Sequence, residues 1–434
     1  MFMPASILGM SLRGLFSIVL LGTGILLLTM WYNHRERQVV EVVEVPVRQE
    51  IIPPDQPDEL RQPKETIERV RTVSWEFDFN KETAFLLGGL ALVGWSLGGG
   101  WVVSPRLLRP TGVDEPATLK GEVQKVRLPD GTHLHVESYG PADAPPIVCV
   151  HGWGLDHQAW CYFTKRFGAD HRIITWDLPG LGQSDKPADR VWSLDRLAQN
   201  LEAVMGVAGK KPVILVGHSI GVMTILTYCK LFPASLGTRV AGLVLGQSTY
   251  TNPLKTMSYA PLYTALQKPV LEPLCHLMIW FSPVYRVLNW MSYWNGSAHR
   301  STERESFSGK ETRGQLDFMT NYYLPASPAV IARGVLGMFR YDATDALARI
   351  PIPTLVVAGD EDGTCLPEAS AFMANTIPLA ELVPLKSAKH CGFFERHADF
   401  HQAVEGFLKS VETGQPGAMP SNPKKATYSV PVPK

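Results

Sequence analysis

Ser219 lies at the centre of a GHSIG pentapeptide, residues 217–221, directly after the apolar run Val213–Val216. The run predicts a buried strand, and Val222–Leu231 predicts the helix that follows it. A serine between two glycines on a sharp strand-to-helix turn presents its hydroxyl to a substrate carbonyl, because the glycines leave room for the turn. A serine hydroxyl is a weak nucleophile unless a base lies beside it. The pattern therefore predicts covalent catalysis by Ser219, provided that the chain also supplies a base and an acid.

Candidates for both roles follow the serine. The segment GDED, residues 359–362, comes after the strand-like run Thr354–Ala358, and His390 comes after the strand-like run 381–385. A histidine can take the serine proton during attack and return it to the leaving group. A carboxylate can hold the imidazole in the required tautomer and stabilise its cation. His397 is an alternative base, although it is expected at the start of the last helix on the surface, and Cys391 is an alternative nucleophile.

Two glycine-rich turns precede the serine. Residues 151–154 read HGWG and follow the apolar run Ile147–Val150, so backbone N–H groups at this turn are free to point at an oxyanion. Residues 177–185 read DLPGLGQSD and follow the strand-like run Arg172–Trp176. The order nucleophile, acid, base in the chain differs from the orders in the chymotrypsin and subtilisin families.

With these motifs in this order, residues 118–411 resemble the α/β-hydrolase superfamily in its serine-nucleophile esterase/lipase branch. The segments that carry the resemblance are HGWG, DLPGLGQSD, GHSIG, GDED and AKHCGFF. The resemblance implies Asp362 as the acid, with Asp360 and Glu361 as alternatives. It also implies an oxyanion hole formed by the backbone N–H groups of Trp153 and Ile220. His151, Asp177 and His218 take structural roles by the same resemblance.

The alternation of strands and helices predicts an α/β fold with a mostly parallel eight-stranded sheet flanked by helices. The strands are expected at about 119–128, 132–138, 146–150, 172–177, 212–218, 239–246, 353–359 and 381–386. The helices are expected at about 157–168, 193–207, 219–232, 366–376 and 398–411. Between 248 and 348 the alternation stops, where the family carries a helical cap. Large apolar residues are dense at 262–294, which favours an apolar substrate tunnel, a membrane-facing lid, or both.

Two uncharged stretches precede this domain, at about 14–32 and 83–104, and each is long enough to span a bilayer as a helix. No small-residue cleavage site follows the first, which argues against a signal peptide. Gly94 and Gly98 form a G-x-x-x-G pair that predicts close helix packing in lipid. We therefore expect a membrane anchor at 1–110, a hydrolase domain at 111–412 and a disordered tail at 413–434. In the polar loop between the spans, 39–47 predicts a strand and 65–73 a short helix.

Composition narrows the classes of partner. The 41 basic and 41 acidic residues balance, which argues against nucleic acid as a partner. No C-x-x-C pair occurs among the six cysteines, and no carboxylate or histidine cluster is apparent beside Asp177, so we expect neither a metal nor a cofactor. Flanking cations lean towards a cytoplasmic loop between the spans, whereas the cysteines favour a reducing compartment for the catalytic domain. We expect the catalytic domain in the cytoplasm; the oligomeric state is unknown from the sequence.

These features predict a membrane-anchored serine hydrolase that cleaves a lipophilic acyl ester, from a small molecule or a lipid of the bilayer, through an acyl-enzyme. An acyltransferase or a cofactor-free perhydrolase could use the same three residues. A non-catalytic membrane scaffold with a hydrolase fold is the alternative from another class, and an intact set of nucleophile, acid, base and oxyanion turn argues against it.

Overall fold

A computed structural model of the protein describes residues 4–35, 39–48, 65–74, 81–107, 114–322 and 324–413. The chain divides into two compact units, one made of Ile18–Ser96 and the other of Met1–Ser17 with Leu97–Lys434. Apart from Thr413, which ends the last helix, the predicted tail at 413–434 lies outside the described residues. The predicted domain boundaries near 110 and 412 stay predictions.

The larger unit is built on an eight-stranded sheet in the order β10-β9-β8-β7-β5-β6-β4-β3. Strand β4 pairs antiparallel to both β3 and β6, whereas the remaining neighbours are parallel. The mostly parallel sheet predicted from the sequence is therefore confirmed. The strands are β3 (Glu122–Arg127), β4 (His133–Tyr139), β5 (Pro146–Val150), β6 (Arg172–Trp176), β7 (Val213–His218), β8 (Val240–Gly246), β9 (Thr354–Gly359) and β10 (Ala380–Leu385).

Helices cover both faces of this sheet, as its uniformly apolar central strands require. On one face a buried cluster joins the sheet to α4, α5 and α13, and on the other a second cluster joins it to α3 and α15. Every residue of α5 from Ile220 to Cys229 is buried, which explains why this helix is apolar on all sides. The flanking helices are α3 (Cys161–Phe167), α4 (Leu194–Met205), α5 (Ile220–Leu231), α12 (Thr344–Leu347), α13 (Pro367–Thr376), α14 (Gly392–Glu395) and α15 (His397–Thr413).

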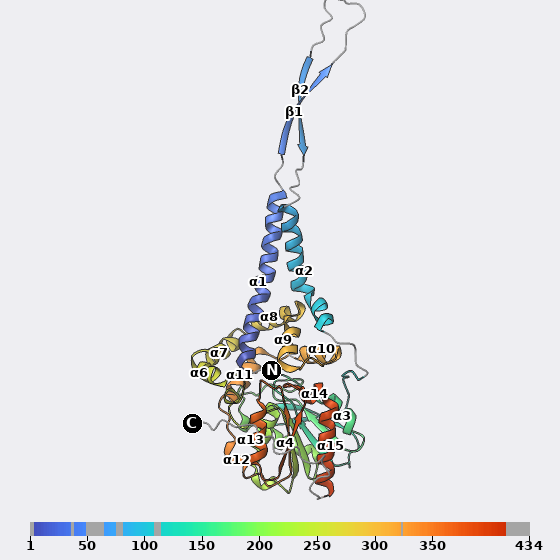
Figure 1. The fold of residues 1–434 in the computed structure, drawn as a ribbon, viewed down its shortest axis with the longest axis vertical. Helices are drawn as coiled ribbons and strands as arrows, with labels where there is room; N and C mark the ends of the chain where they lie inside the picture. Colours follow the sequence, from blue (N-terminus) through green and yellow to red (C-terminus); the bar gives the residue numbers. More distant parts are fainter. Residues whose placement is uncertain are drawn as a thin grey trace, which may run out of the picture. The chain divides into compact units, whose positions relative to one another are not determined.

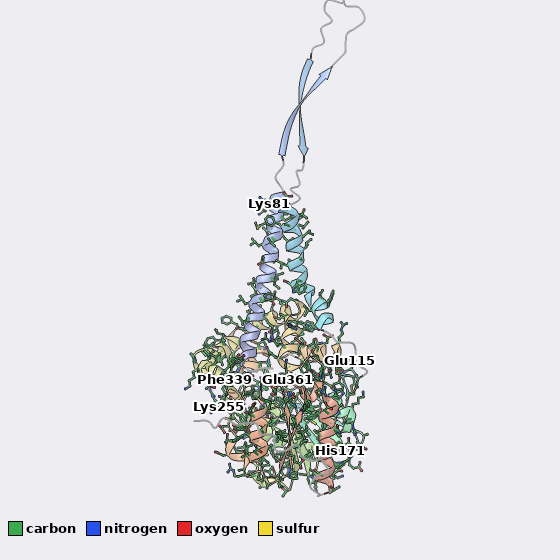
Figure 2. All side chains as sticks on the ribbon, viewed as in Figure 1. Lys81, Glu115, His171, Lys255, Phe339 and Glu361 are labelled. Atoms are coloured by element: carbon green, nitrogen blue, oxygen red, sulfur yellow. The ribbon has the colours of Figure 1, made fainter. Side chains whose placement is uncertain are left out.

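The predicted cap is present as a group of helices between β8 and β9. Figure 1 shows α6 to α11 gathered at one end of the sheet. In Figure 2, Glu361 after β9 lies on this side, whereas His171 before β6 lies towards the opposite end, so the carboxyl ends of the parallel strands point to the cap. The cap helices are α6 (Ala260–Leu266), α7 (Glu272–Trp280), α8 (Ser282–Trp294), α9 (Ser297–Ser306), α10 (Arg313–Tyr322) and α11 (Pro328–Met338).

The smaller unit contains most of two long helices, α1 (Pro4–Arg35) and α2 (Lys81–Leu107), and the antiparallel pair β1 (Val39–Arg48) and β2 (Glu65–Ser74). The segments Leu12–His34 and Lys81–Val103 are long and apolar enough to cross a membrane. The strand at 39–47 is confirmed, but the short helix predicted at 65–73 is wrong. Alternating β-branched and charged residues suit a strand. The paired residues run from Arg48 with Glu65 to Val39 with Ser74, too far apart in the sequence for a local pattern to reveal the pairing.

No helix in the described part of the chain makes the close approach that Gly94 and Gly98 would allow. A Cβ added at either glycine would meet no atom within 4 Å in the described part of the chain. The two long helices approach instead at Gly24, where a Cβ would lie 2.9 Å from Val93, and at Gly89, where it would lie 2.7 Å from Leu28. Small residues do allow the approach, but they come one from each helix.

Candidate active site

Ser219 occupies the tight turn between β7 and α5 with φ 55° and ψ −121°, a backbone conformation that costs free energy for any residue other than glycine. Both flanking positions must be glycine, because a Cβ there would overlap the backbone of neighbouring residues. A Cβ at Gly221 would lie 2.1 Å from the carbonyl oxygen of Val150, and a Cβ at Gly217 would lie 2.8 Å from the amide nitrogen of Val222. The sharp turn predicted from the sequence is therefore present, and the sequence could not have tolerated larger residues at these positions.

The structure brings together the three residues predicted to act in catalysis. The Oγ of Ser219 lies 3.0 Å from Nε2 of His390, and Nδ1 of His390 lies 2.9 Å from Oδ2 of Asp362. A carboxylate accepts only, so Nδ1 carries the proton and Nε2 is the acceptor that faces the serine hydroxyl. Each of the three side chains is at least nine-tenths buried. This arrangement can take the proton from Ser219 as its oxygen attacks a carbonyl carbon.

Backbone donors fix the orientation of the acid. Oδ1 of Asp362 accepts hydrogen bonds from the N–H groups of Thr364 at 2.8 Å and Cys365 at 3.0 Å, which leaves Oδ2 for the imidazole. Burial lowers the pKa of His390 below its ordinary value of 6.5, and the Asp362 carboxylate opposes that effect. The imidazole is consequently neutral at pH 7, as a general base must be.

The alternative acids point elsewhere. Asp360 accepts the Ala388 N–H at 3.2 Å through Oδ1, and Glu361 is exposed. Neither makes a hydrogen bond to His390 in the described part of the chain, and the geometry favours Asp362.

The alternative base and the alternative nucleophile are also engaged away from Ser219. His397 begins α15, pairs with Asp114 at 3.2 Å and stacks on Tyr162 with ring centroids 3.9 Å apart, so it is half-buried rather than the surface residue expected. Cys391 is buried, and burial raises the pKa of its thiol to about 12. A thiol with that pKa supplies almost no thiolate at neutral pH, which argues against it as a nucleophile.

The two predicted oxyanion donors belong to the correct turns. Ile220 is the first residue of α5, and Trp153 lies in the turn after β5. The indole N–H of Trp153 donates to the Ile331 carbonyl at 3.1 Å, and its ring packs so closely on α11 that a Cβ at Gly334 would lie 2.0 Å from it. The cap helix thus fixes the turn that carries Trp153. That the two backbone N–H groups stabilise an oxyanion stays a prediction.

Two histidines in the motifs have structural contacts. Nε2 of His151 accepts the Leu178 N–H at 3.0 Å, which ties the HGWG turn to the next motif. His218 lies beneath the triad, where its Nε2 is 2.8 Å from the carbonyl oxygen of His390. Burial, followed by the nearby His390, holds the pKa of His218 well below its ordinary value, so its Nε2 donates as a neutral ring. These contacts agree with the structural roles that the resemblance implied.

Two residues at the end of β8 were not anticipated. Ser248 donates its hydroxyl to the Ser219 carbonyl at 2.7 Å and so supports the strained turn from the neighbouring strand. Gln247 has φ 39° and is buried, and both polar atoms of its side chain lack a hydrogen-bond partner among the described residues. The only signal in the sequence was their position directly after a predicted strand at the carboxyl edge of the sheet.

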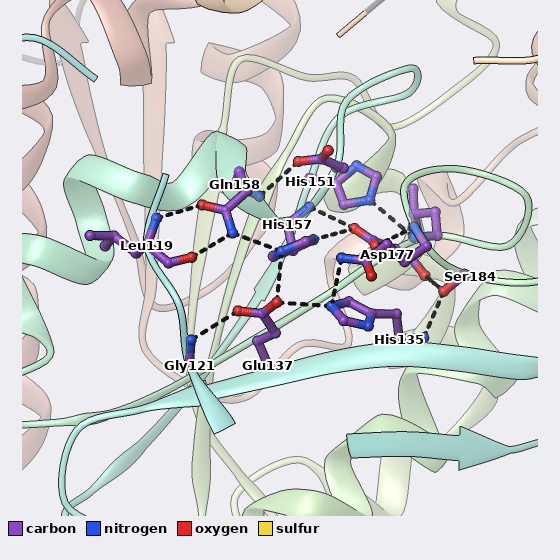
Figure 3. Close-up of polar contacts among 12 residues, drawn as sticks. Leu119, Gly121, His135, Glu137, His151, His157, Gln158, Asp177 and Ser184 are labelled. Atoms are coloured by element: carbon purple, nitrogen blue, oxygen red, sulfur yellow. Dashed lines mark hydrogen bonds and ion pairs between the residues drawn. The ribbon is translucent and has the colours of Figure 1, made fainter. Parts of the chain in front are cut away.

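A buried polar cluster surrounds Asp177, contrary to the expectation that it has no histidine or carboxylate neighbours (Figure 3). Oδ1 of Asp177 accepts from the backbone and from Nδ1 of His157, at 2.7 and 2.8 Å. Nε2 of His157 is 3.1 Å from Glu137, and Nε2 of His135 is 3.0 Å from the same carboxylate oxygen. The sequence did not predict this cluster, because its members come from separate strands and turns.

Residue type alone would allow His135, His157 and Asp177 to hold a metal, since one ligand atom from each falls within 4.8 Å of the others. Protein donors already engage these groups: the second oxygen of Asp177 accepts the Gln183 N–H at 2.8 Å. Glu137 accepts the Tyr139 hydroxyl at 2.6 Å. The contacts favour a polar brace between the first strands and the 177–185 loop. The absence of a metal stays a prediction, but the reason first given for it was wrong.

Comparison with known proteins agrees with this architecture. The sequence model of the Alpha/beta hydrolase family matches residues 147–403. The chain is 25% identical over 285 residues to a pimeloyl-[acyl-carrier protein] methyl ester esterase of Aeromonas salmonicida, covering 63% of this chain and 99% of that protein. It is 23% identical over 286 residues to an AB hydrolase superfamily protein of Bacillus subtilis, covering 66% and 98%.

Among solved structures, a thermophilic esterase from Thermogutta terrifontis superposes with a TM-score of 0.53 at 24% identity, covering 67% of this chain and 99% of that one. At that identity the likeness establishes the fold alone. The relatives and structural neighbours are esterases and other hydrolases.

Proposed function

The chain belongs to the alpha/beta hydrolase family, and from this premise we propose that it hydrolyses a carboxylic ester through Ser219, His390 and Asp362. The observation that carries the proposal is the continuous path from Ser219 Oγ through the imidazole to the carboxylate, with steps of 3.0 and 2.9 Å. A structural serine in a turn has no need of a buried base aligned by a buried acid.

Acylation and deacylation each take one proton onto the imidazole and return it. Nε2 of His390 accepts the hydroxyl proton while Ser219 Oγ bonds to the ester carbonyl carbon, and the N–H groups of Trp153 and Ile220 stabilise the resulting oxyanion. The proton then passes to the departing alkoxide, which leaves as the alcohol and gives an acyl-enzyme. Water then attacks the acyl carbon as the same nitrogen takes its proton, and that proton passes to Ser219 Oγ as the bond between Oγ and the acyl carbon breaks, which releases the carboxylic acid and restores the serine hydroxyl.

A lipophilic acyl group is the substrate class that the cap favours. Large apolar side chains remain exposed on α6 to α8, among them Trp280 at 73% and Leu262 at 55%. A soluble protein seldom leaves such groups gathered on its surface without an apolar partner. One relative is named as an esterase of a pimeloyl-[acyl-carrier protein] methyl ester, and the apolar cap favours a lipophilic acyl group for this chain.

Membrane anchoring by α1 and α2 is the second half of the proposal. The segments Leu12–His34 and Lys81–Val103 would form the two spans, so that residues before the first and after the second lie on one side. All six cysteines are free and buried, which favours a reducing compartment and hence a cytoplasmic catalytic unit. Alkaline carbonate extraction tests the spans: the full chain is expected in the membrane pellet, and its release into the supernatant would rule them out.

Hydrolysis of p-nitrophenyl esters of graded chain length tests the activity. We expect turnover that increases from acetate to medium-chain esters and disappears in the Ser219→Ala variant. Added alcohol or hydrogen peroxide shows which nucleophile the acyl-enzyme prefers, because transfer to either would yield an ester or a peracid in place of the acid. Wild-type protein without turnover on any of these esters would contradict the proposal.

A further inference from the structure

Arg190 and Arg333 line one cavity beside the cap, and Lys186 and Arg286 lie near them. Lys186 and Arg190 belong to the segment before α4, Arg286 to α8 and Arg333 to α11. In the part of the chain that the structure describes, none of the four forms an ion pair. Burial and repulsion by the three arginines lower the pKa of Lys186, and burial together with repulsion by Arg190 lowers the pKa of Arg333. Like charges held this close destabilise the fold unless an anion joins them.

The backbone holds Arg190 in place at a cost. Its φ of 57° is in the left-handed region, which is unfavourable for a long side chain. The adjacent carboxylate does not neutralise it, because Asp189 pairs with Arg196 at 2.6 Å and accepts the Val191 N–H at 3.0 Å. A strained residue that keeps its charge free is typical of a ligand contact.

A cavity of about 620 Å³ opens next to this cluster, apart from the catalytic residues. Arg190, Arg333, Arg340 and Lys230 line it together with Trp280, and none of the triad residues does. Two carboxylates also line the cavity. Asp342 accepts hydrogen bonds from the Thr251 hydroxyl and the Thr344 N–H, both at 2.9 Å, and Asp195 is exposed. Cations therefore outnumber acidic groups around the cavity, with an aromatic wall on one side.

An apolar ridge continues from the cavity along the end of α7 and the start of α8. It consists of Trp280, Phe281, Val284 and Val287, exposed by 73, 53, 52 and 58%, and Arg286 of α8 is also exposed. A bilayer surface presents headgroup phosphates outside the acyl chains. Cations suit the phosphates, and the exposed aromatic and branched apolar side chains beside them suit the acyl chains.

The ends of both candidate spans pack on the same helix within this unit. From α1, a Cβ at Gly14 would lie 2.8 Å from Leu288, and Ser17 accepts a hydrogen bond from Asn295 at 2.7 Å. From α2, a Cβ at Gly100 would lie 2.8 Å from the Tyr293 carbonyl oxygen. Since Gly14, Ser17 and Gly100 lie near the ends of the two candidate spans, the part of α8 that they contact lies near the membrane surface if the spans cross a bilayer.

We propose that Lys186, Arg190, Arg286 and Arg333 bind the phosphate of anionic phospholipid headgroups, while the ridge at Trp280–Val287 inserts among the acyl chains. The inference rests on the membrane anchoring of the proposed function and names the lipid surface on which the enzyme works. Anionic lipid would hold the cap over the bilayer, where lipophilic esters concentrate.

The test measures lipid binding by the full chain in a neutral detergent. The probes are acyl-chain-labelled, ether-linked phosphatidylglycerol and phosphatidylcholine, which contain no ester to hydrolyse. We expect the wild type to prefer phosphatidylglycerol, and Arg190→Gln/Arg286→Gln to weaken that binding by about thirtyfold, at roughly fivefold for each cation near an anionic headgroup. Both arginines are exposed, so the variant is expected to fold. Lys210→Gln/Lys211→Gln is the matched control, since these lysines line a different cavity, and it should bind as the wild type does.

Equal binding of phosphatidylglycerol by the wild type and the double-arginine variant would overturn the inference. So would displacement of the probe by inorganic phosphate at low millimolar concentration, because the site would then serve a soluble anion. Turnover of p-nitrophenyl acetate, measured in the same samples, separates the two proposals. Normal turnover without a lipid preference defeats this inference alone, and absent turnover in the wild type defeats the proposed hydrolase.

Discussion

The carboxyl edge of the sheet and the outer face of the cap differ in how far their side chains are buried. At the edge, Ser219, Asp362 and His390 are almost fully buried, and neighbouring groups fix each of them. On the cap, Trp280 and Phe281 are exposed by 73 and 53%. The difference separates two tasks: bond-making chemistry needs a rigid, dry site, whereas recognition of a fluid apolar phase needs exposed area rather than fixed geometry.

The largest expected effect comes from removing the attacking oxygen. Ser219→Ala should lower kcat by about a million-fold, the order seen when a triad serine is lost. Stability should change little, because the serine hydroxyl packs in a turn held by backbone contacts. Turnover of a p-nitrophenyl ester and thermal unfolding measure the two quantities. Residual turnover near that of the wild type would remove Ser219 from the mechanism.

The acid that contacts the imidazole should matter far more than the acidic residues beside it. Asp362→Asn leaves the imidazole in the wrong tautomer, and kcat should fall by about 10⁴-fold. Asp360→Asn is the control, since the Asp360 carboxylate accepts the Ala388 N–H and makes no hydrogen bond to His390 among the described residues, and its effect should stay within about threefold. Equal losses in the two variants, measured as kcat at saturating ester, would mean that the acid is not Asp362.

The pH dependence of kcat/KM tests whether the base at the carboxyl edge of the sheet is shielded from water. Burial lowers the pKa of His390 below 6.5, and only the neutral imidazole can accept the serine proton. As the pH falls, kcat/KM should therefore stay level through 6.5 and decline about tenfold per unit only below the lowered pKa. An acid limb centred above pH 6.5 on a short-chain ester would contradict a desolvated base.

Substitutions on the cap should have the smallest effect on turnover, and the effect should be confined to the long-chain ester. Trp280→Ser/Phe281→Ser should lower turnover of a long-chain ester in vesicles by about tenfold, because two large apolar side chains no longer enter the lipid. Turnover of p-nitrophenyl acetate should be unchanged. Val123→Ser/Leu379→Ser removes two equally exposed apolar residues elsewhere and serves as the control. Parallel losses on both esters would assign the cap residues to the catalytic site instead.

The same contrast explains what the sequence could predict. Short local runs of the sequence predict the strands, the turn at Ser219 and the order of nucleophile, acid and base. The structure agrees with these predictions. The cluster around Asp177 joins His135, Glu137 and His157 across separate elements, and no local pattern announces such neighbours. The strand at Glu65–Ser74 was mistaken for a helix because its partner strand, not its own composition, decides its structure.

Cap residues were foreseen only as a dense apolar segment. Their spacing indicated neither which side chains would be buried nor that Arg286 would face cations from α11 and the segment before α4. Met278 is fully buried while Trp280, two residues on, is exposed, because contacts with distant helices choose between them. Roles that depend on tertiary neighbours therefore required the structure.

Covalent labelling of the full chain with a fluorophosphonate tests the central claim most directly. The reagent reacts with a serine only when a neighbouring base makes its oxygen nucleophilic. Intact mass should show one adduct, and peptide mapping should place it on Ser219. The Asp362→Asn variant should react slowly and Ser219→Ala not at all. An unlabelled wild type, or an adduct on any other residue, would contradict a serine hydrolase that works through Ser219.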